Sequence, residues 1–147
     1  MQQILVEGFN KGIAQMLAGS KDRLYIAIGS GDESWDTEGL PDDVPTSTQY
    51  LMQERARLPV ASIEYLDSEG TVSGIPTPKV KITSGIFTGE EYRGAVRECG
   101  LYLTENSLQT MLLYSVFARV DITEQATLTK CLTLTLGSQE ETVIHIP

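Results

Sequence analysis

The sequence predicts a mainly β protein with one N-terminal helix, an α+β chain that forms an antiparallel β-sandwich or an open barrel. Apolar residues recur every three to four positions only near the N-terminus, which is typical of an amphipathic helix. About six strand-like runs follow at short spacing, without the helical runs that parallel crossovers require. The length of 147 residues fits a single domain, 1–147.

The N-terminal helix is predicted over residues 1–20. Gly19 is placed to end this helix in the left-handed conformation. The apolar face of the helix has two open uses: it covers one side of the sheet, or it docks a partner. The residues of this face are Ile4, Leu5, Phe9, Ile13, Met16 and Leu17.

A β-rich body is predicted over residues 24–136, and it begins with a buried strand over residues 24–28. This run is short, apolar and bounded by small residues, as buried strands are. Gly29 and Gly31 follow it and are expected to form the turn that leaves the strand.

Residues 32–47 are predicted to be an exposed acidic loop. They contain several Asp, Glu and Pro residues but neither Lys nor Arg. Trp35 and Leu40 lie within this loop and are candidate contacts for a partner, because Trp is enriched at the energetic centres of interfaces. The alternative for Trp35 is that it folds back on its own sheet.

The rest of the body is predicted to be mostly strands. Residues 48–58 form a short helical or extended segment that stops before Pro59. In the last strand leucines alternate with threonines, so Leu128, Leu132, Leu134 and Leu136 are expected to be buried on one face. In the strand before it, one face is expected to carry Tyr114, Val116, Ala118, Val120 and Ile122. The predicted strands are 60–66, 79–83, 95–102, 112–122 and 127–136, followed by a C-terminal tail, 137–147.

Charge and hydropathy exclude several classes of function. Asp and Glu number 20 against 11 Lys and Arg, a net charge of −9, which argues against a nucleic-acid binder because such proteins need a basic face. No run approaches the ~20 apolar residues of a membrane span, so none is expected. The N-terminus does not resemble a signal peptide, so we expect synthesis in a cytoplasm.

Catalytic, cofactor and metal motifs are not found in the sequence. The one histidine, His145, lies near the C-terminus, and Cys99 and Cys131 with it do not supply a zinc site. The acidic loop does not match an EF-hand calcium loop, since Thr37 stands where that loop needs Gly. Calcium binding by this loop remains an alternative only because its carboxylates are the ligands that calcium prefers. We therefore expect no enzymatic activity, no cofactor and no metal.

Four charged residues, Glu54, Arg57, Arg97 and Glu98, are predicted to form a structural ion-pair network. Arg97 and Glu98 are adjacent in a predicted strand and must point to opposite faces, so one of them faces the apolar side and needs a partner. Glu54 or Arg57 is expected to provide that partner. Gly100 is expected where a side chain cannot fit.

Three segments together carry a resemblance to a known family. They are YIAIGSGD at 25–32, Leu51 with Glu54 and Arg57, and RECGLY at 97–102. In this order and spacing they resemble the N-terminal domain of phage tail-collar fibre proteins, which has relatives in other contractile-tail and injection-system components. The resemblance extends over about residues 1–137, although residues 71–91 have no counterpart in it.

The resemblance implies a structural virion protein of a phage tail or a related contractile particle. Such a protein acts as a collar, baseplate or fibre-attachment adaptor in the tail, after synthesis in the host cytoplasm. Its implied partners are other tail, baseplate or fibre proteins, and copies of itself in a homo-oligomer or ring. Residues 32–47 and 137–147 are predicted to be mobile alone and ordered by neighbours. The alternative is a small β-sandwich module that binds a carbohydrate or another ligand.

Overall fold

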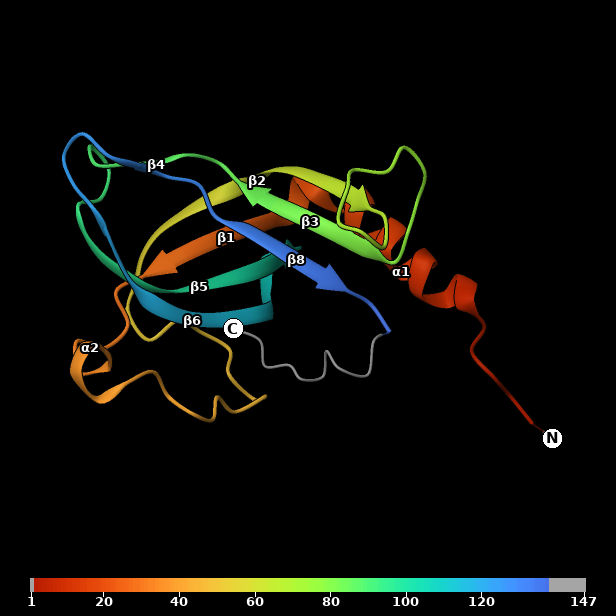
Figure 1. Cartoon of the computed structure of the whole chain (residues 1–147), viewed down its shortest axis with the longest axis horizontal. Coiled ribbons are helices and arrows are strands. Elements are labelled where there is room, and N and C mark those ends of the chain that lie inside the picture. Colours follow the sequence, from red (N-terminus) through yellow and green to blue (C-terminus); the bar gives the residue numbers. More distant parts are fainter. Residues whose placement is uncertain (1, 138–147) are drawn as a thin grey trace.

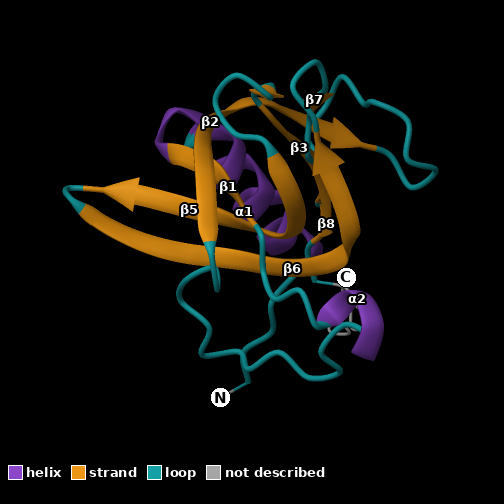
Figure 2. Cartoon of the chain, turned by 90° about the vertical axis from the view of Figure 1, so that its left-hand side faces the viewer, coloured by secondary structure: helices purple, strands orange, loops and turns teal. Residues whose placement is uncertain are grey.

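The computed structural model describes residues 2–137 and confirms the predicted α+β class (Figure 1). One antiparallel sheet curls into half a barrel, so the open barrel is correct and the sandwich is not (Figure 2). Apart from Gly137, the predicted tail lies outside the described residues. The elements are α1 (Glu7–Gly19), a 3-10 turn (Lys21–Arg23), β1 (Leu24–Gly29), α2 (Trp35–Glu38), β2 (Glu54–Leu66), β3 (Lys79–Ser84), β4 (Phe87–Thr88), β5 (Gly94–Glu105), β6 (Leu108–Ile122), β7 (Thr127–Leu128) and β8 (Cys131–Thr135).

The main sheet has the strand order β6-β5-β1-β2-β3-β8, and each neighbouring pair is antiparallel. Strand β1 lies between β5 and β2 and is almost entirely buried, as its short apolar run predicts. Strands β4 and β7 form a separate two-stranded ladder. No helix among residues 2–137 is long and apolar enough to cross a membrane.

The core is divided between the two faces of the sheet. On the face that α1 covers, Leu24, Ile26 and Ile28 alternate along β1 and pack with side chains of β3, β5 and β8. Burying each such side chain stabilises the fold by roughly 1.5–3 kcal/mol. On the other face a smaller cluster contains Ala27, Leu51, Tyr102, Met111 and Tyr114. This smaller cluster adjoins the candidate site described below.

The predicted helix is present, but it begins at Glu7 and not at residue 1, because residues 2–6 are not helical. A different face of it from the predicted one is buried. Ala14 is fully buried and Leu17 packs against the core, while Phe9, Ile13 and Met16 remain exposed. The predicted role of Gly19 is wrong, because it has no positive φ. Gly19 is still the last residue of the helix, and Ser20 caps it: its N–H donates to the Leu17 carbonyl and its hydroxyl donates to that of Met16.

Strand β2 runs continuously through Pro59, so the predicted break there is wrong. The Pro59 carbonyl accepts a hydrogen bond from Gly85, just past the end of β3. The register between β2 and β3 also shifts between Val60 and Ser62. The ladder therefore needs no N–H at position 59, which is where a strand tolerates proline.

The alternating leucines near the C-terminus lie on the core side, as predicted. Leu132 is buried, and Leu128, Leu134 and Leu136 pack against the main core. The run is divided into β7 and β8, because the N–H of Lys130 bonds to the Ser84 hydroxyl instead of continuing one ladder.

The predicted single face of β6 is wrong. Ile122 packs in the main core, whereas Tyr114 packs on the other face with Tyr102. The register between β5 and β6 shifts between Val96 and Glu98, and this irregularity changes which residues share a face.

Candidate functional site

Two features stand out in the described structure. The first is a buried carboxylate, Glu98 on β5, at the end of the sheet where the chain leaves β1. It fastens residues 30–53, which link β1 to β2 and are called the 30–53 connection below. The second is the exposed apolar face of α1. Neither feature depends on a histidine, a cysteine or a bound group.

The Glu98 side chain is fully buried and accepts four hydrogen bonds. Its Oε1 accepts from the backbone N–H of Met52 at 2.9 Å and from the Tyr114 hydroxyl at 2.6 Å. Its Oε2 accepts from the backbone N–H of Gln53 at 2.7 Å and of Gly31 at 3.1 Å. Both ends of the 30–53 connection are therefore held by one carboxylate.

These four donors satisfy a group that would otherwise be costly to bury. Backbone N–H groups and a hydroxyl stabilise a carboxylate through short hydrogen bonds, in place of the water it loses. Burial and the neighbouring Glu98 carboxylate raise the pKa of Tyr114 far above its ordinary value. The Tyr114 hydroxyl therefore keeps its proton and stays a donor. Within residues 2–137, no Lys or Arg forms an ion pair with Glu98.

Gly29 leaves room for this carboxylate. It faces Glu98 across the ladder between β1 and β5. A Cβ at this position would lie 2.4 Å from Glu98 Oε2 and 2.6 Å from the Gln53 carbonyl oxygen. Both distances are too short for a carbon atom. The site therefore needs glycine because it has no side chain, and not because of its backbone conformation.

Arg97 holds the same connection from the opposite face of β5. Its side chain is buried, and its Nε and Nη2 donate to the two carboxylate oxygens of Asp36 at 2.9 and 2.8 Å. Its Nη1 donates to the Ser30 carbonyl at 2.7 Å. This two-pronged pairing with the carboxylate fixes α2 in position and orientation.

Trp35, which begins α2, folds back on Gly31 in the turn after β1; that it packs on its own sheet stays a prediction. Gly31 has a φ of +59°, and a Cβ there would lie 2.4 Å from the Trp35 ring. The ring thus covers the turn after β1. Leu40 is exposed, and its role as a partner contact stays a prediction. The mobility predicted for 32–47 in the free protein is likewise untested.

The structure pairs the four predicted ion-pair residues differently from the sequence-based expectation. Arg57 pairs with Glu54 at 2.9 Å and lies 4.2 Å above the Tyr102 ring. Arg97 pairs with Asp36, and Glu98 binds backbone amides. The sequence offers no signal for those amides, because any residue type carries an N–H. Asp36 of α2, the partner of Arg97, could not be singled out from the sequence, since the loop around it contains several other acidic residues.

Gly100 lies where a side chain does not fit, as expected, although the obstacle is other side chains and not backbone. A Cβ there would be 2.7 Å from Leu51 Cδ1 and 3.0 Å from Met111 Cε. Leu51 is also held through its N–H, which donates to the Tyr102 hydroxyl at 3.3 Å. The absence of a side chain at Gly100 thus lets Leu51, near the end of the 30–53 connection, pack directly against β5.

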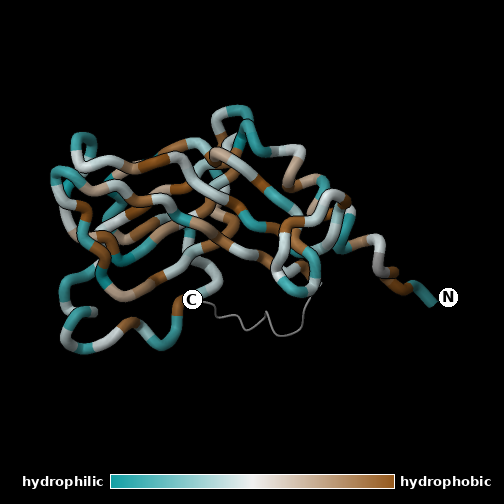
Figure 3. The backbone as a smooth tube through the Cα atoms, turned by 45° about the horizontal axis from the view of Figure 1, so that its top comes forward, coloured by the Kyte–Doolittle hydropathy of each residue, from teal (hydrophilic) through white to brown (hydrophobic). Residues whose placement is uncertain are grey.

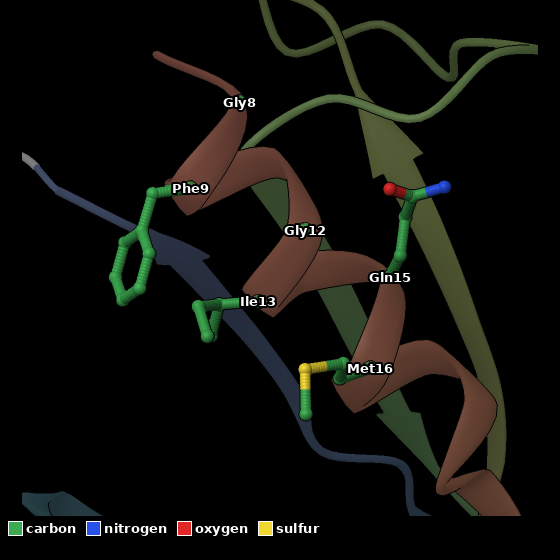
Figure 4. A pocket seen from close by; sticks show the side chains of 6 residues that line it. All are labelled: Gly8, Phe9, Gly12, Ile13, Gln15 and Met16. Atoms are coloured by element: carbon green, nitrogen blue, oxygen red, sulfur yellow. The ribbon is translucent and has the colours of Figure 1, made fainter. Parts of the chain in front are cut away.

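The apolar face of α1 points away from the sheet into solvent. Phe9, Ile13 and Met16 project from the same side of the helix and are 47%, 36% and 69% exposed (Figure 4). Gly8 and Gly12 lie beside them, and apart from their chain neighbours and the helix backbone no atom stands within 4 Å of where their Cβ atoms would be. These five residues and Gln15 line an open groove.

The Asp36–Arg97 contact predicts an acid-sensitive change at Trp35, the single tryptophan. The hydrogen bond from Arg97 is the main cause that holds the pKa of Asp36 below its usual 3.8. A lowered pKa means that the contact contributes stability above pH 3.8 and loses it as the pH falls through the lower, folded-state value. Trp35 emission should therefore shift to longer wavelength only below about pH 3.8.

Two variants check this pH dependence. Asp36→Asn should show the shifted emission already at neutral pH, since Arg97 then lacks its carboxylate. Asp42→Asn, an exposed change in the same loop, should behave like the wild type. An Asp36→Asn spectrum identical to the wild type at all pH values would refute the contact's role.

Comparisons with known proteins add no assignment: no family model and no curated protein matches this chain.

Proposed function

We propose that the protein is a non-enzymatic structural subunit of a phage tail or a related contractile particle, which joins a fibre, collar or baseplate component by protein–protein assembly. The observation that carries this proposal is the exposed apolar surface at the N-terminus. Ile4, Leu5 and Val6 are 68–76% exposed and directly precede α1 in the chain. Figure 3 shows this hydrophobic stretch beyond the body of the protein. Contiguous exposed apolar surface commonly marks an interaction site.

The three segments that suggest the family also converge around Glu98. Gly29 of the first segment faces Glu98 of the third across a ladder. Leu51 of the second segment packs against Gly100 and bonds to Tyr102 of the third. Residues far apart in the sequence thus form one structural unit. This convergence supports a shared framework, which is why we favour the tail-adaptor role.

A fastened connection suits an assembly role. Glu98 and Arg97 fix the 30–53 connection from both faces of β5 with hydrogen bonds that involve buried groups. A surface held in one shape loses less conformational entropy when a partner binds. The net charge of −9 further favours partners that present basic or neutral surfaces.

Co-expression with the proteins encoded on either side of its gene tests this proposal. We expect a stoichiometric complex with a tail, baseplate or fibre protein, identified by size-exclusion chromatography and mass spectrometry. Met16→Glu should weaken that complex, whereas Glu90→Gln, an exposed change far from α1 in sequence, should not. A chain that stays alone and binds glycans on an array would instead support the ligand-binding alternative.

A further inference from the structure

We propose that the apolar face of α1 binds the same face of a second copy, so that the chain forms a two-fold dimer through α1. This inference deepens the proposed assembly role by naming the first partner of the helix. It rests on that role but fails separately from it, because a monomeric chain can still join neighbouring proteins.

The size of the exposed apolar surface fits an interface between two copies. Phe9, Ile13 and Met16 of α1 and the extended residues 4–6 before it present apolar side chains to solvent. From their exposed fractions, these six residues leave at most roughly 700 Å² per chain for an interface, the same order as the ~800 Å² per partner that a standard stable interface buries. A monomer that left this surface in water would be prone to association.

The shape of the helix is complementary to itself. Phe9, Ile13 and Met16 form a ridge, and Gly8 and Gly12, four residues apart, form a flat strip beside it. Figure 4 shows that neither glycine carries anything that would fill this strip. If two α1 helices cross near Gly12 about a two-fold axis, the ridge of each packs on the strip of the other. Small residues at this spacing allow close approach of helices, and a two-fold contact requires such self-complementarity.

The charge distribution favours contact at this helix over contact elsewhere. Residues 1–20 contain one acid, Glu7, and one base, Lys11, so their net charge is zero. The whole excess of nine negative charges therefore lies in residues 21–147. Two copies repel each other through most of their surface but not through the N-terminal segment. The apolar partner that this face fits best is thus another neutral, apolar helix of the same kind.

Strand β6, one of the two edges of the main sheet within the described residues, is a competing surface for a second copy. It is an edge strand of the main sheet, and Leu112 on it is 45% exposed. Edge strands can pair with other chains. However, exposed apolar side chains are more continuous on α1 and the residues before it than on β6. The test therefore uses Leu112→Glu as its matched control.

Sedimentation velocity of the full chain tests the dimer from roughly 1 to 100 µM, the range for an interface of moderate size. We expect the wild type to approach twice its mass of 16.1 kDa as concentration rises. Met16→Glu should raise the dimer dissociation constant by about tenfold or more, because it buries an unpaired charge. Leu112→Glu should leave the constant unchanged.

Gly12→Gln separates loss of the dimer from loss of the fold. Gly12 has open space around it, and Gln is a better helix former, so the monomer should melt at the same or a higher temperature. The same side chain would block the strip and should weaken the dimer by about tenfold or more. A wild type that stays monomeric up to about 100 µM overturns the inference. So does a dimer that Gly12→Gln leaves intact or that Leu112→Glu disrupts.

Discussion

Replacing Glu98 with Gln should lower the free energy of unfolding by about 3 kcal/mol. Both carboxylate oxygens accept two hydrogen bonds, and a Gln side chain has only one oxygen. Its NH₂ group would face at least one backbone N–H, from Met52 or from Gln53 and Gly31. That N–H would then be left buried without an acceptor. Urea unfolding monitored by circular dichroism measures the loss.

Glu90→Gln is the control for this substitution. It makes the same chemical change at an exposed site and should alter the free energy of unfolding by less than about 0.5 kcal/mol. Hydrogen exchange at Met52 and Gln53 should also accelerate in Glu98→Gln and not in Glu90→Gln. If both variants unfolded like the wild type, the carboxylate would not be what fastens the 30–53 connection.

Gly29→Ala should have a comparable effect, a loss of about 3 kcal/mol. The added methyl group would overlap both Glu98 Oε2 and the Gln53 carbonyl, and the second is backbone, which cannot rotate away. Thermal or urea unfolding measures the change. The matched control is Gly74→Ala, because no atom lies within 4 Å of the Cβ it would add.

Gly29→Ala should be coupled to Glu98→Ala, because both disturb the same carboxylate. The double variant should lose less stability than the sum of these two single losses, since removing the carboxylate relieves one of the two overlaps of the methyl group, while the overlap with the Gln53 carbonyl remains. Strictly additive losses would mean that Gly29 and Glu98 act independently. A neutral Gly29→Ala would contradict the close approach itself.

The strands could largely be predicted because their patterns are local. The short apolar run of β1 and the alternating leucines of β7 and β8 each follow from residues next to one another. The sequence-based predictions were wrong where contacts with distant segments of the chain determine the bounds of a strand or the face on which a side chain lies. Pro59 lies inside β2 only because β3 has ended beside it, and Tyr114 changes face relative to Ile122 because the register with β5 shifts.

The candidate site could be predicted in part. Adjacent opposite charges in a strand indicated that one of Arg97 and Glu98 faces the apolar side and needs a partner, whereas in the structure both are buried and both have partners. Their partners could not be derived, since Glu98 binds backbone N–H groups, which any sequence supplies. Asp36 stands in a run of similar acids, so nothing in the sequence separates it from the others. Only the folded path of the 30–53 connection brings these groups together.

The use of the α1 face could not be decided from its periodicity. An amphipathic pattern shows that a helix has an apolar side but not what covers that side. In the structure Ala14 contacts the core, so the helix turns Phe9 and Met16 toward solvent. This geometry is what directs our proposal to association.

Oxidation of two methionines tests the central claim, that the chain works by assembly through α1. Met16 and Met52 are 69% and 55% exposed, so a brief hydroxyl-radical pulse should oxidise both at similar rates in the dilute protein. In the concentrated protein we predict that Met16 oxidation slows several-fold relative to Met52, as measured by peptide mass spectrometry. Equal rates for the two methionines in both the free and the assembled states would contradict the account.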